Sequence, residues 1–169
     1  MTALAPTASA DNPLGAATGG GIADPAGDVE IAADQVLAQA EIDSIDVTRL
    51  RWKVVKGRYA SFRLHVVAAG SPGPHRAFFG VSASAGRASV LIAARKKKVV
   101  VVDDTGRHRC RGGTARLDEE RDFVRLQLPV RCLPGTRYSF APITLLEDPR
   151  GGRDVASDQV KRTPRVTIR

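Results

Sequence analysis

The chain is poor in the residue types that mark many kinds of functional site. Its 169 residues include two cysteines, three histidines and eight aromatic residues. Two cysteines alone do not complete a zinc site, because such sites are usually built from four ligands. No stretch approaches the roughly 20 apolar residues that a membrane-spanning helix needs. The sequence therefore predicts neither a structural zinc site nor a membrane-spanning helix.

Strong catalytic motifs are also lacking. Gly80–Ser84 falls one residue short of the G-x-S-x-G nucleophile elbow, and that motif belongs to an α/β fold that this chain is too short and too rich in predicted strands to build. The three histidines lie in basic surroundings without an adjacent carboxylate. Glu119 and Glu120 stand side by side in a charged turn, which favours solvation over paired acid–base chemistry. We therefore predict that the protein is not an enzyme.

Positive charge is absent from the N-terminal part of the chain. Residues 1–48 include no Lys, Arg or His and eight Asp or Glu, which gives a net charge of −8. Residues 49–169 carry all 26 basic side chains against ten acidic ones, a net charge of +16, and 20 of the 26 are Arg. An acidic leading segment thus precedes, or packs against, a basic body. The arginine content has two interpretations, a GC-rich genome or selection for phosphate and carboxylate binding.

The composition of residues 1–21 predicts a disordered leader, because Ala, Thr, Gly and Pro dominate and little can be buried. Ala8-Ser9-Ala10 has the small–x–small pattern of a signal-peptidase site, although the basic and apolar regions that should precede it are missing. Either the chain begins inside a truncated signal peptide, or the match is chance in an Ala-rich tail. We expect a secreted or cell-envelope protein in which residues 22–169 form one domain.

The cysteine pair gives a second argument for export. Cys110 and Cys132 are the two cysteines of the chain, and neither belongs to a C-x-x-C motif. A disulfide between them would close a short loop, stabilise the fold by roughly 3 kcal/mol and require an oxidising compartment. Two free thiols are one alternative, and a metal site that includes His108 is another. We expect the disulfide.

Apolar and polar residues alternate along much of the chain from residue 46 onward. In Arg49–Val54 and Ser61–Val66 the period is two, and Gly57 between them suits a hairpin turn. The one helical candidate is Ala32–Gln39. Seven to nine short strands predict an all-β fold, an antiparallel β-sandwich that is Ig-like or jelly-roll-like, with one disulfide. The further strand candidates are residues 77–84, 88–94, 99–102, 114–117, 123–128, 138–146 and 165–168.

Short motifs resemble a known group of extracellular modules. Asp24-Pro25-Ala26-Gly27-Asp28, followed by Asp46-Val47-Thr48-Arg49-Leu50, resembles the opening of secreted bacterial β-sandwich modules of the DOMON-like and glucodextranase C-terminal group. Leu128–Leu133, with Asp158 and Pro164, is similar to uncharacterised secreted proteins of high-GC Gram-positive bacteria. The resemblance implies an extracellular sandwich with a carbohydrate-binding or surface-association role.

Five aspartates are candidate ligands of a calcium ion. A D-x-x-G-D segment can aim two carboxylates at one point because Gly permits a tight bend, and calcium takes six to eight oxygen ligands. The spacing is not that of an EF-hand loop. The alternative is that these residues cap turns and pair with nearby arginines. The candidates are Asp24, Asp28, Asp43, Asp46 and Asp158.

Four cations on one face of the first two predicted strands are candidates for anion binding. They are Arg49, Arg51, Lys53 and Arg63. A cationic face is typical of nucleic-acid binding, but no stacking aromatics accompany it in register. The alternatives are that this face is exposed to solvent, or that the acidic N-terminal segment, residues 1–48, covers it.

The function predicted from these observations is that of a non-catalytic secreted module that binds a surface ligand, either a glycan or an anionic envelope polymer. Calcium is the one candidate cofactor. A nucleic-acid-binding protein that uses the Arg-rich face is the first alternative. A structural protein without a small ligand is the second.

Overall fold

Antiparallel strands account for most of the structure, as the period-two pattern predicts. The computed structural model describes residues 17–70, 73–85, 88–95, 97–150, 153–159 and 162–168. In chain order, the elements are β1 (Ala17–Ala23), β2 (Glu30–Ile31), α1 (Gln39–Asp43), β3 (Val47–Val55), β4 (Tyr59–Val66), β5 (Arg76–Ala85), β6 (Ala88–Arg95), β7 (Lys98–Asp103), β8 (Gly106–Asp118), β9 (Phe123–Pro129), the 3-10 helix η1 (Val130–Cys132), β10 (Arg137–Glu147), β11 (Asp154–Gln159) and β12 (Val166–Thr167).

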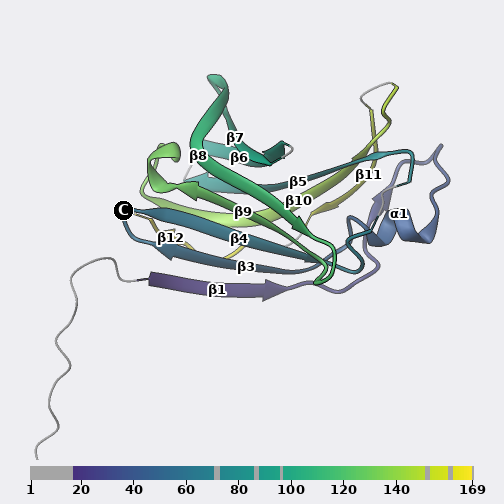
Figure 1. Ribbon diagram of the computed structural model, residues 1–169, viewed down its shortest axis with the longest axis horizontal. Helices are drawn as coiled ribbons and strands as arrows, with labels where there is room; N and C mark the ends of the chain where they lie inside the picture. The colour runs from purple at the N-terminus through teal and green to yellow at the C-terminus, as the bar shows by residue number, and fades with distance from the viewer. Residues whose placement is uncertain are drawn as a thin grey trace, which may run out of the picture.

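The strands pair in one continuous sheet that curls on itself (Figure 1). Its order is β1-β3-β4-β9-β8-β7-β6-β5-β10-β11-β2, and β12 pairs with β10. Five strands separate β4 from β10 in this order. Phe62 on β4 and Phe140 on β10 nevertheless have ring centroids only 4.7 Å apart. The two halves of the sheet therefore face each other and enclose the core.

The core consists of the inward side chains of the alternating strands. On β3, Leu50 and Val54 are buried, whereas Arg51 and Lys53 between them are exposed. Burial of one face and solvation of the other fixes the register of each strand, because a slip by one residue would exchange the two faces. The largest fully buried side chains include Tyr138, Phe62, Phe140, Leu50, Leu64, Ile92, Leu126, Leu128, Leu133 and Ile168.

The all-β, antiparallel prediction is confirmed, but the expected strand count is too low. Twelve strands are present among the described residues instead of seven to nine. A sandwich of two separate sheets is not confirmed, because hydrogen-bonded pairing runs without a break from β1 to β2. The predicted hairpin between β3 and β4 is present, with Gly57 at a φ of 69°. Strands β1, β2 and β11 were missed because they lack a clear alternating pattern.

The leader prediction is wrong for residues 17–21, which form most of β1. Pairing with β3 needs backbone groups and no apolar side chain, so composition alone does not reveal this strand. Gly20 lies opposite Trp52, and a Cβ at Gly20 would lie 2.8 Å from a ring atom of Trp52. Glycine therefore allows β1 to pass close to the indole ring. The Ala8-Ser9-Ala10 motif lies outside the described residues.

The short helix also differs from the prediction, which placed it at Ala32–Gln39. It begins after Ala38, because the carboxylate of Glu41 accepts a hydrogen bond from the Ala38 amide at 2.9 Å and so caps the first turn. No helix in the described part of the chain is long and apolar enough to cross a membrane.

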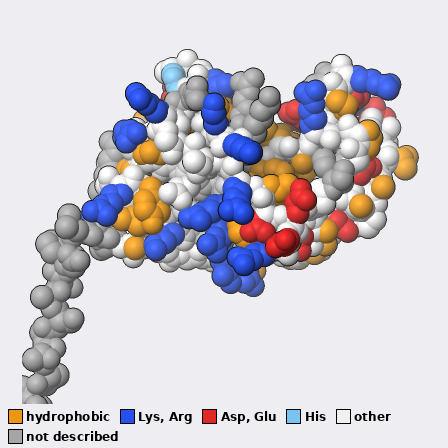
Figure 2. Space-filling view, in the orientation of Figure 1, with side chains coloured by type: hydrophobic (Ala, Val, Ile, Leu, Met, Phe, Trp, Pro, Cys, Tyr) orange, Lys and Arg blue, Asp and Glu red, His pale blue; other side chains and the backbone are white. Residues whose placement is uncertain are grey.

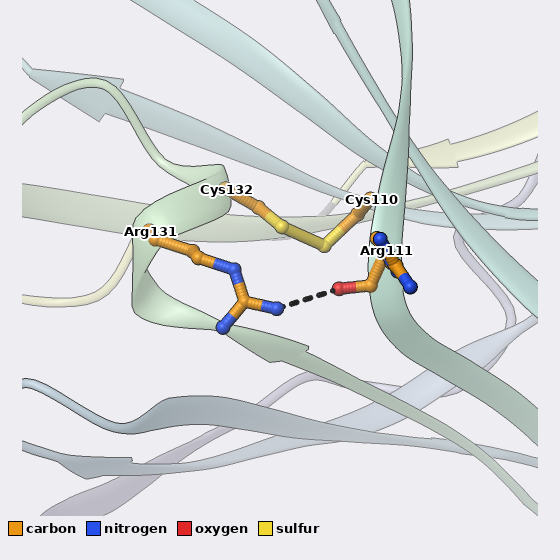
Figure 3. The surroundings of a disulfide bond; sticks show 4 residues. All are labelled: Cys110, Arg111, Arg131 and Cys132. Atoms are coloured by element: carbon orange, nitrogen blue, oxygen red, sulfur yellow. Dashed lines mark hydrogen bonds between the residues drawn. A yellow bond between two sulfur atoms is a disulfide. The ribbon is translucent and has the colours of Figure 1, made fainter.

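The predicted disulfide is present and joins two parts of the fold. Cys110 on β8 is bonded to Cys132 at the end of η1, with 5.7 Å between the Cα atoms (Figure 3). Beside it, the guanidinium group of Arg131 donates a hydrogen bond to the carbonyl oxygen of Arg111 at 3.2 Å. Both contacts hold the segment that follows β9 against the middle of β8.

Candidate anion-binding face and acidic cluster

Four arginines form a row across the outer face of the sheet, which we call the arginine row. Arg51 on β3 lies opposite Arg63 on β4, and Arg63 lies opposite Arg125 on β9. Arg125 in turn lies opposite Arg116 on β8, and all four side chains are exposed. Neighbouring strands are about 4.8 Å apart, so the row places four positive charges on roughly 15 Å of surface.

The arginine row has no acidic partner among the described residues. No carboxylate forms an ion pair with any of the four guanidinium groups in the part of the chain that the structure describes. Arg125 donates to the side-chain oxygen of Gln127 at 2.9 Å, and the guanidinium carbon of Arg63 lies 5.4 Å from the ring centroid of Phe123. Like charges directly opposite each other on adjacent strands destabilise a sheet. The row therefore costs stability unless an anion from outside neutralises it.

The four cations predicted from the sequence lie on this face, and the structure adds two more. Arg49 and Lys53 are exposed on β3 at outward positions on either side of Arg51. Arg116 and Arg125 were missed, although Arg125 alternates with apolar residues in β9 just as Arg51 does in β3. Figure 2 shows Lys and Arg side chains gathered over the region where β3, β4 and β9 run in Figure 1.

A shallow cleft of about 360 Å³ lies along this face. The adjoining strand β1 is built from Ala, Thr, Gly and Ile and carries no charge. Its outward positions beside Lys53 and Arg51 are Gly19 and Gly21, which have no side chain to cover the cations. Among the described residues, the acidic N-terminal segment therefore does not cover the arginine row. The lining residues are Gly20, Arg51, Trp52, Lys53, Tyr59, Ser61, Arg63 and Arg125.

His65 reports on the positive potential of this face. It is half-buried on β4, opposite Arg49, and its ring is 5.4 Å from the ring of Phe123. Its Nε2 atom is buried without a hydrogen-bond partner among the described residues. Burial first, and then repulsion by Arg51, Arg49 and Arg63, lowers the pKa of His65 below its ordinary value of 6.5. The imidazole is therefore held in its neutral form next to the arginines.

Three of the five predicted calcium ligands converge at a second location. Asp24 follows β1, Asp28 precedes β2, and Asp158 lies on β11. One carboxylate oxygen of each lies within 4.8 Å of those of the other two. Gly27, with a φ of 91°, makes the tight bend that the sequence predicted between Asp24 and Asp28.

Asp46 adjoins this group, and Asp43 does not belong to it. Oδ2 of Asp46 accepts a hydrogen bond from the Gly27 amide at 2.6 Å, whereas Asp43 accepts one from the side chain of Gln39 at 2.7 Å. Oδ2 of Asp158 accepts one from the Val47 amide at 2.6 Å. We call Asp24, Asp28, Asp46 and Asp158 the acidic cluster.

Burial and mutual repulsion raise two pKa values in the acidic cluster. Asp46 and Asp158 are both only 2% exposed. Burial is the largest cause of the rise in the pKa of Asp158 to about 6, and the charges of Asp28, Asp24 and Asp46 add to it. The pKa of Asp46 is also raised, mainly by burial. These carboxylates are therefore in an environment that opposes their negative charge.

Comparisons with known proteins leave this geometry as the main guide to function. No family model, curated protein or solved structure matches the chain. The resemblance to DOMON-like and glucodextranase C-terminal modules therefore stays a prediction.

Proposed function

We propose that the protein is a secreted, non-catalytic module that binds an anionic polymer of the cell envelope, an acidic polysaccharide, across its arginine row. The observation that carries this proposal is the alignment of Arg51, Arg63, Arg125 and Arg116 on four adjacent strands, without acidic partners among the described residues. A chain of carboxylates or phosphates laid across the strands would meet one guanidinium group at each strand, and these groups favour such anions through paired hydrogen bonds.

The aromatic residues favour an acidic polysaccharide over single-stranded nucleic acid. Nucleic-acid surfaces of this kind place exposed aromatic rings beside the cations so that bases can stack. Here Phe123 is 9% exposed and Tyr59 and Trp52 are half-buried. The face therefore offers charge and hydrogen-bond donors, and none of these three rings is fully exposed for stacking.

The disulfide supports the extracellular part of the proposal. Disulfides persist in oxidising compartments and are rare where thiols are kept reduced. The pair Cys110–Cys132 leaves no free cysteine among the described residues.

A retention experiment with matched charge reversals tests the proposal. The full chain is applied at low salt to immobilised polygalacturonate, to a neutral cellulose matrix and to single-stranded DNA. We expect retention on polygalacturonate that is lost as salt rises, because salt screens exposed charges. The double variant Arg51→Glu with Arg125→Glu should bind at least tenfold more weakly.

The control makes the same change of charge elsewhere on the molecule. Arg107 on β8 and Arg137 on β10 are both exposed and lie outside the cleft, so the double variant Arg107→Glu with Arg137→Glu should stay within about threefold of the parent. Equal weakening by both double variants would reduce the effect to net charge and overturn the proposal. Tighter binding to DNA than to polygalacturonate would overturn it in favour of the nucleic-acid alternative.

A further inference from the structure

The acidic cluster lies where the two ends of the curled sheet come together. Strands β1 and β2 are the first and last in the sheet order, and the chain connects them through residues 24–29. Asp24 and Asp28 are on this connection, which we call the β1–β2 connection. The Val47 amide at the start of β3 donates to Asp158 on β11, so the strands next to the two edges are also in contact.

The carboxylate of Asp46 gives evidence that does not depend on clustering alone. Its Oδ1 atom is buried and has no hydrogen-bond partner among the described residues, while Oδ2 is bound by the Gly27 amide. Gly27 directly precedes Asp28, so this bond fixes Asp46 against the β1–β2 connection. A buried carboxylate oxygen without a donor is unfavourable. A cation held by the neighbouring carboxylates would offset the negative charge of Asp46, on which the charge of Asp28 already acts.

Three of the carboxylates in the acidic cluster have no basic partner among the described residues. Neither Asp28, Asp46 nor Asp158 forms an ion pair with Lys, Arg or His within the described ranges. The hydrogen bonds to Asp46 and Asp158 come from neutral backbone amides. Buried carboxylates are normally paired or bound to a metal, and these two are 2% exposed beside further negative charge.

We propose that Asp24, Asp28 and Asp158, whose carboxylate oxygens lie within 4.8 Å of one another, bind one calcium ion beside the buried carboxylate of Asp46. The ion fastens the β1–β2 connection to β11 and closes the curled sheet. Calcium is favoured over magnesium by the ligand set. Calcium accepts several carboxylates in flexible geometry, whereas magnesium demands an octahedral arrangement and usually keeps several waters. The site is separate from the arginine row, so its test does not depend on polymer binding.

Calorimetric titration of the chelator-treated full chain with calcium chloride, and separately with magnesium chloride, tests the site. We expect a single calcium site and weaker binding of magnesium. At a calcium concentration about 100 times the Kd, the Tm should rise by roughly 5–10 °C, because the ion binds the folded chain and not the unfolded one.

The variant Asp28→Asn separates loss of the ion from loss of the fold. Asp28 is exposed, and one of its carboxylate oxygens lies within 4.8 Å of those of Asp24 and Asp158. Removal of its charge relieves repulsion between like charges, so the variant should have a Tm in chelator no lower than that of the parent. Its calcium affinity should fall at least tenfold, since affinity follows the number of charged ligands. The matched variant Asp104→Asn, at an exposed turn position between β7 and β8, should bind calcium like the parent.

Three results would overturn the proposal. One is the same Tm in calcium and in chelator with no heat of binding. Another is equal weakening by Asp28→Asn and Asp104→Asn, which would indicate a diffuse charge effect. The third is magnesium binding as tight as that of calcium.

Discussion

Arg51, Arg63 and Arg125 occupy outward positions in strands whose neighbouring positions hold buried Leu50, Leu64 and Leu126. Each arginine is ordinary within its own strand, since a solvated face normally alternates with a buried one. The concentration of positive charge arises between strands, where the guanidinium groups lie opposite one another. At the residue scale, the pKa of the neighbouring His65 depends on this positive charge.

His65 should therefore titrate differently with and without a bound polyanion. In the free protein we expect its pKa below 6.5, as burial and the adjacent arginines dictate. A bound acidic polymer neutralises the arginines and should raise this pKa, whereas the part of the shift due to burial remains. NMR titration of the His65 ring protons, with and without soluble polygalacturonate, measures the change.

The sign of the stability effect follows from the same pKa. Because the fold favours neutral His65, its contribution to stability is full above the ordinary pKa of 6.5 and is lost as the pH falls through the lowered value.

The variant Arg51→Glu with Arg125→Glu is the control for the NMR titration, since the polymer should leave its His65 titration unchanged. A polymer that leaves the parent's His65 pKa unchanged would contradict contact with this face.

At the scale of elements, the disulfide joins β8 to η1 across a sequence separation of 22 residues. Closing a loop of this length removes conformational freedom from the unfolded chain, which is worth about 3 kcal/mol. Replacing both Cys110 and Cys132 by Ser should lower the Tm by roughly 6–12 °C for a domain of this size. Thermal unfolding followed by circular dichroism measures the change.

The hydrogen bond beside the disulfide supplies a control at the same junction. The variant Arg131→Ala removes the bond to the Arg111 carbonyl, which is exposed and should contribute less than about 1 kcal/mol. If the double Ser variant and Arg131→Ala lowered the Tm equally, the disulfide would not be the main restraint between β8 and η1.

At the scale of the whole molecule, continuous pairing from β1 to β2 predicts a single cooperative unfolding transition. The protein has one tryptophan, Trp52, which lies opposite Gly20 of β1 and packs against the core. Its fluorescence therefore reports on the β1 edge, whereas far-ultraviolet circular dichroism reports on the whole sheet. The two denaturation curves, measured in urea, should coincide. An earlier fluorescence transition would show that β1 separates before the rest unfolds.

The charge of the whole molecule is divided unevenly between its N-terminal segment and the rest of the chain. Residues 1–48 carry a net charge of −8 and residues 49–169 carry +16. The described part of residues 1–48 nevertheless does not cover the arginine row. Contacts join this acidic segment to basic side chains: Asp34 pairs with Arg153, and Glu41 pairs with His75. In the same segment, Asp24, Asp28 and Asp46 belong to the acidic cluster with Asp158, beyond the end of β1.

The sequence by itself determined most of the strands and their faces. Alternation placed Leu50 and Phe62 inside and Arg51 and Arg63 outside, because burying one face of a strand is the main local source of stability. It also identified the disulfide, since the two cysteines have only each other as partners. It misjudged residues 17–21, because β1 is held by backbone pairing and by the absence of side chains at its glycines.

Only the tertiary structure decided which distant residues share a site. Arg125 joins Arg51 and Arg63 because β9 pairs with β4, a register that depends on strands far apart in the chain. Asp158 joins Asp24 because the sheet curls until its two ends meet. Such pairings depend on the packing of the whole core and leave no trace in local periodicity.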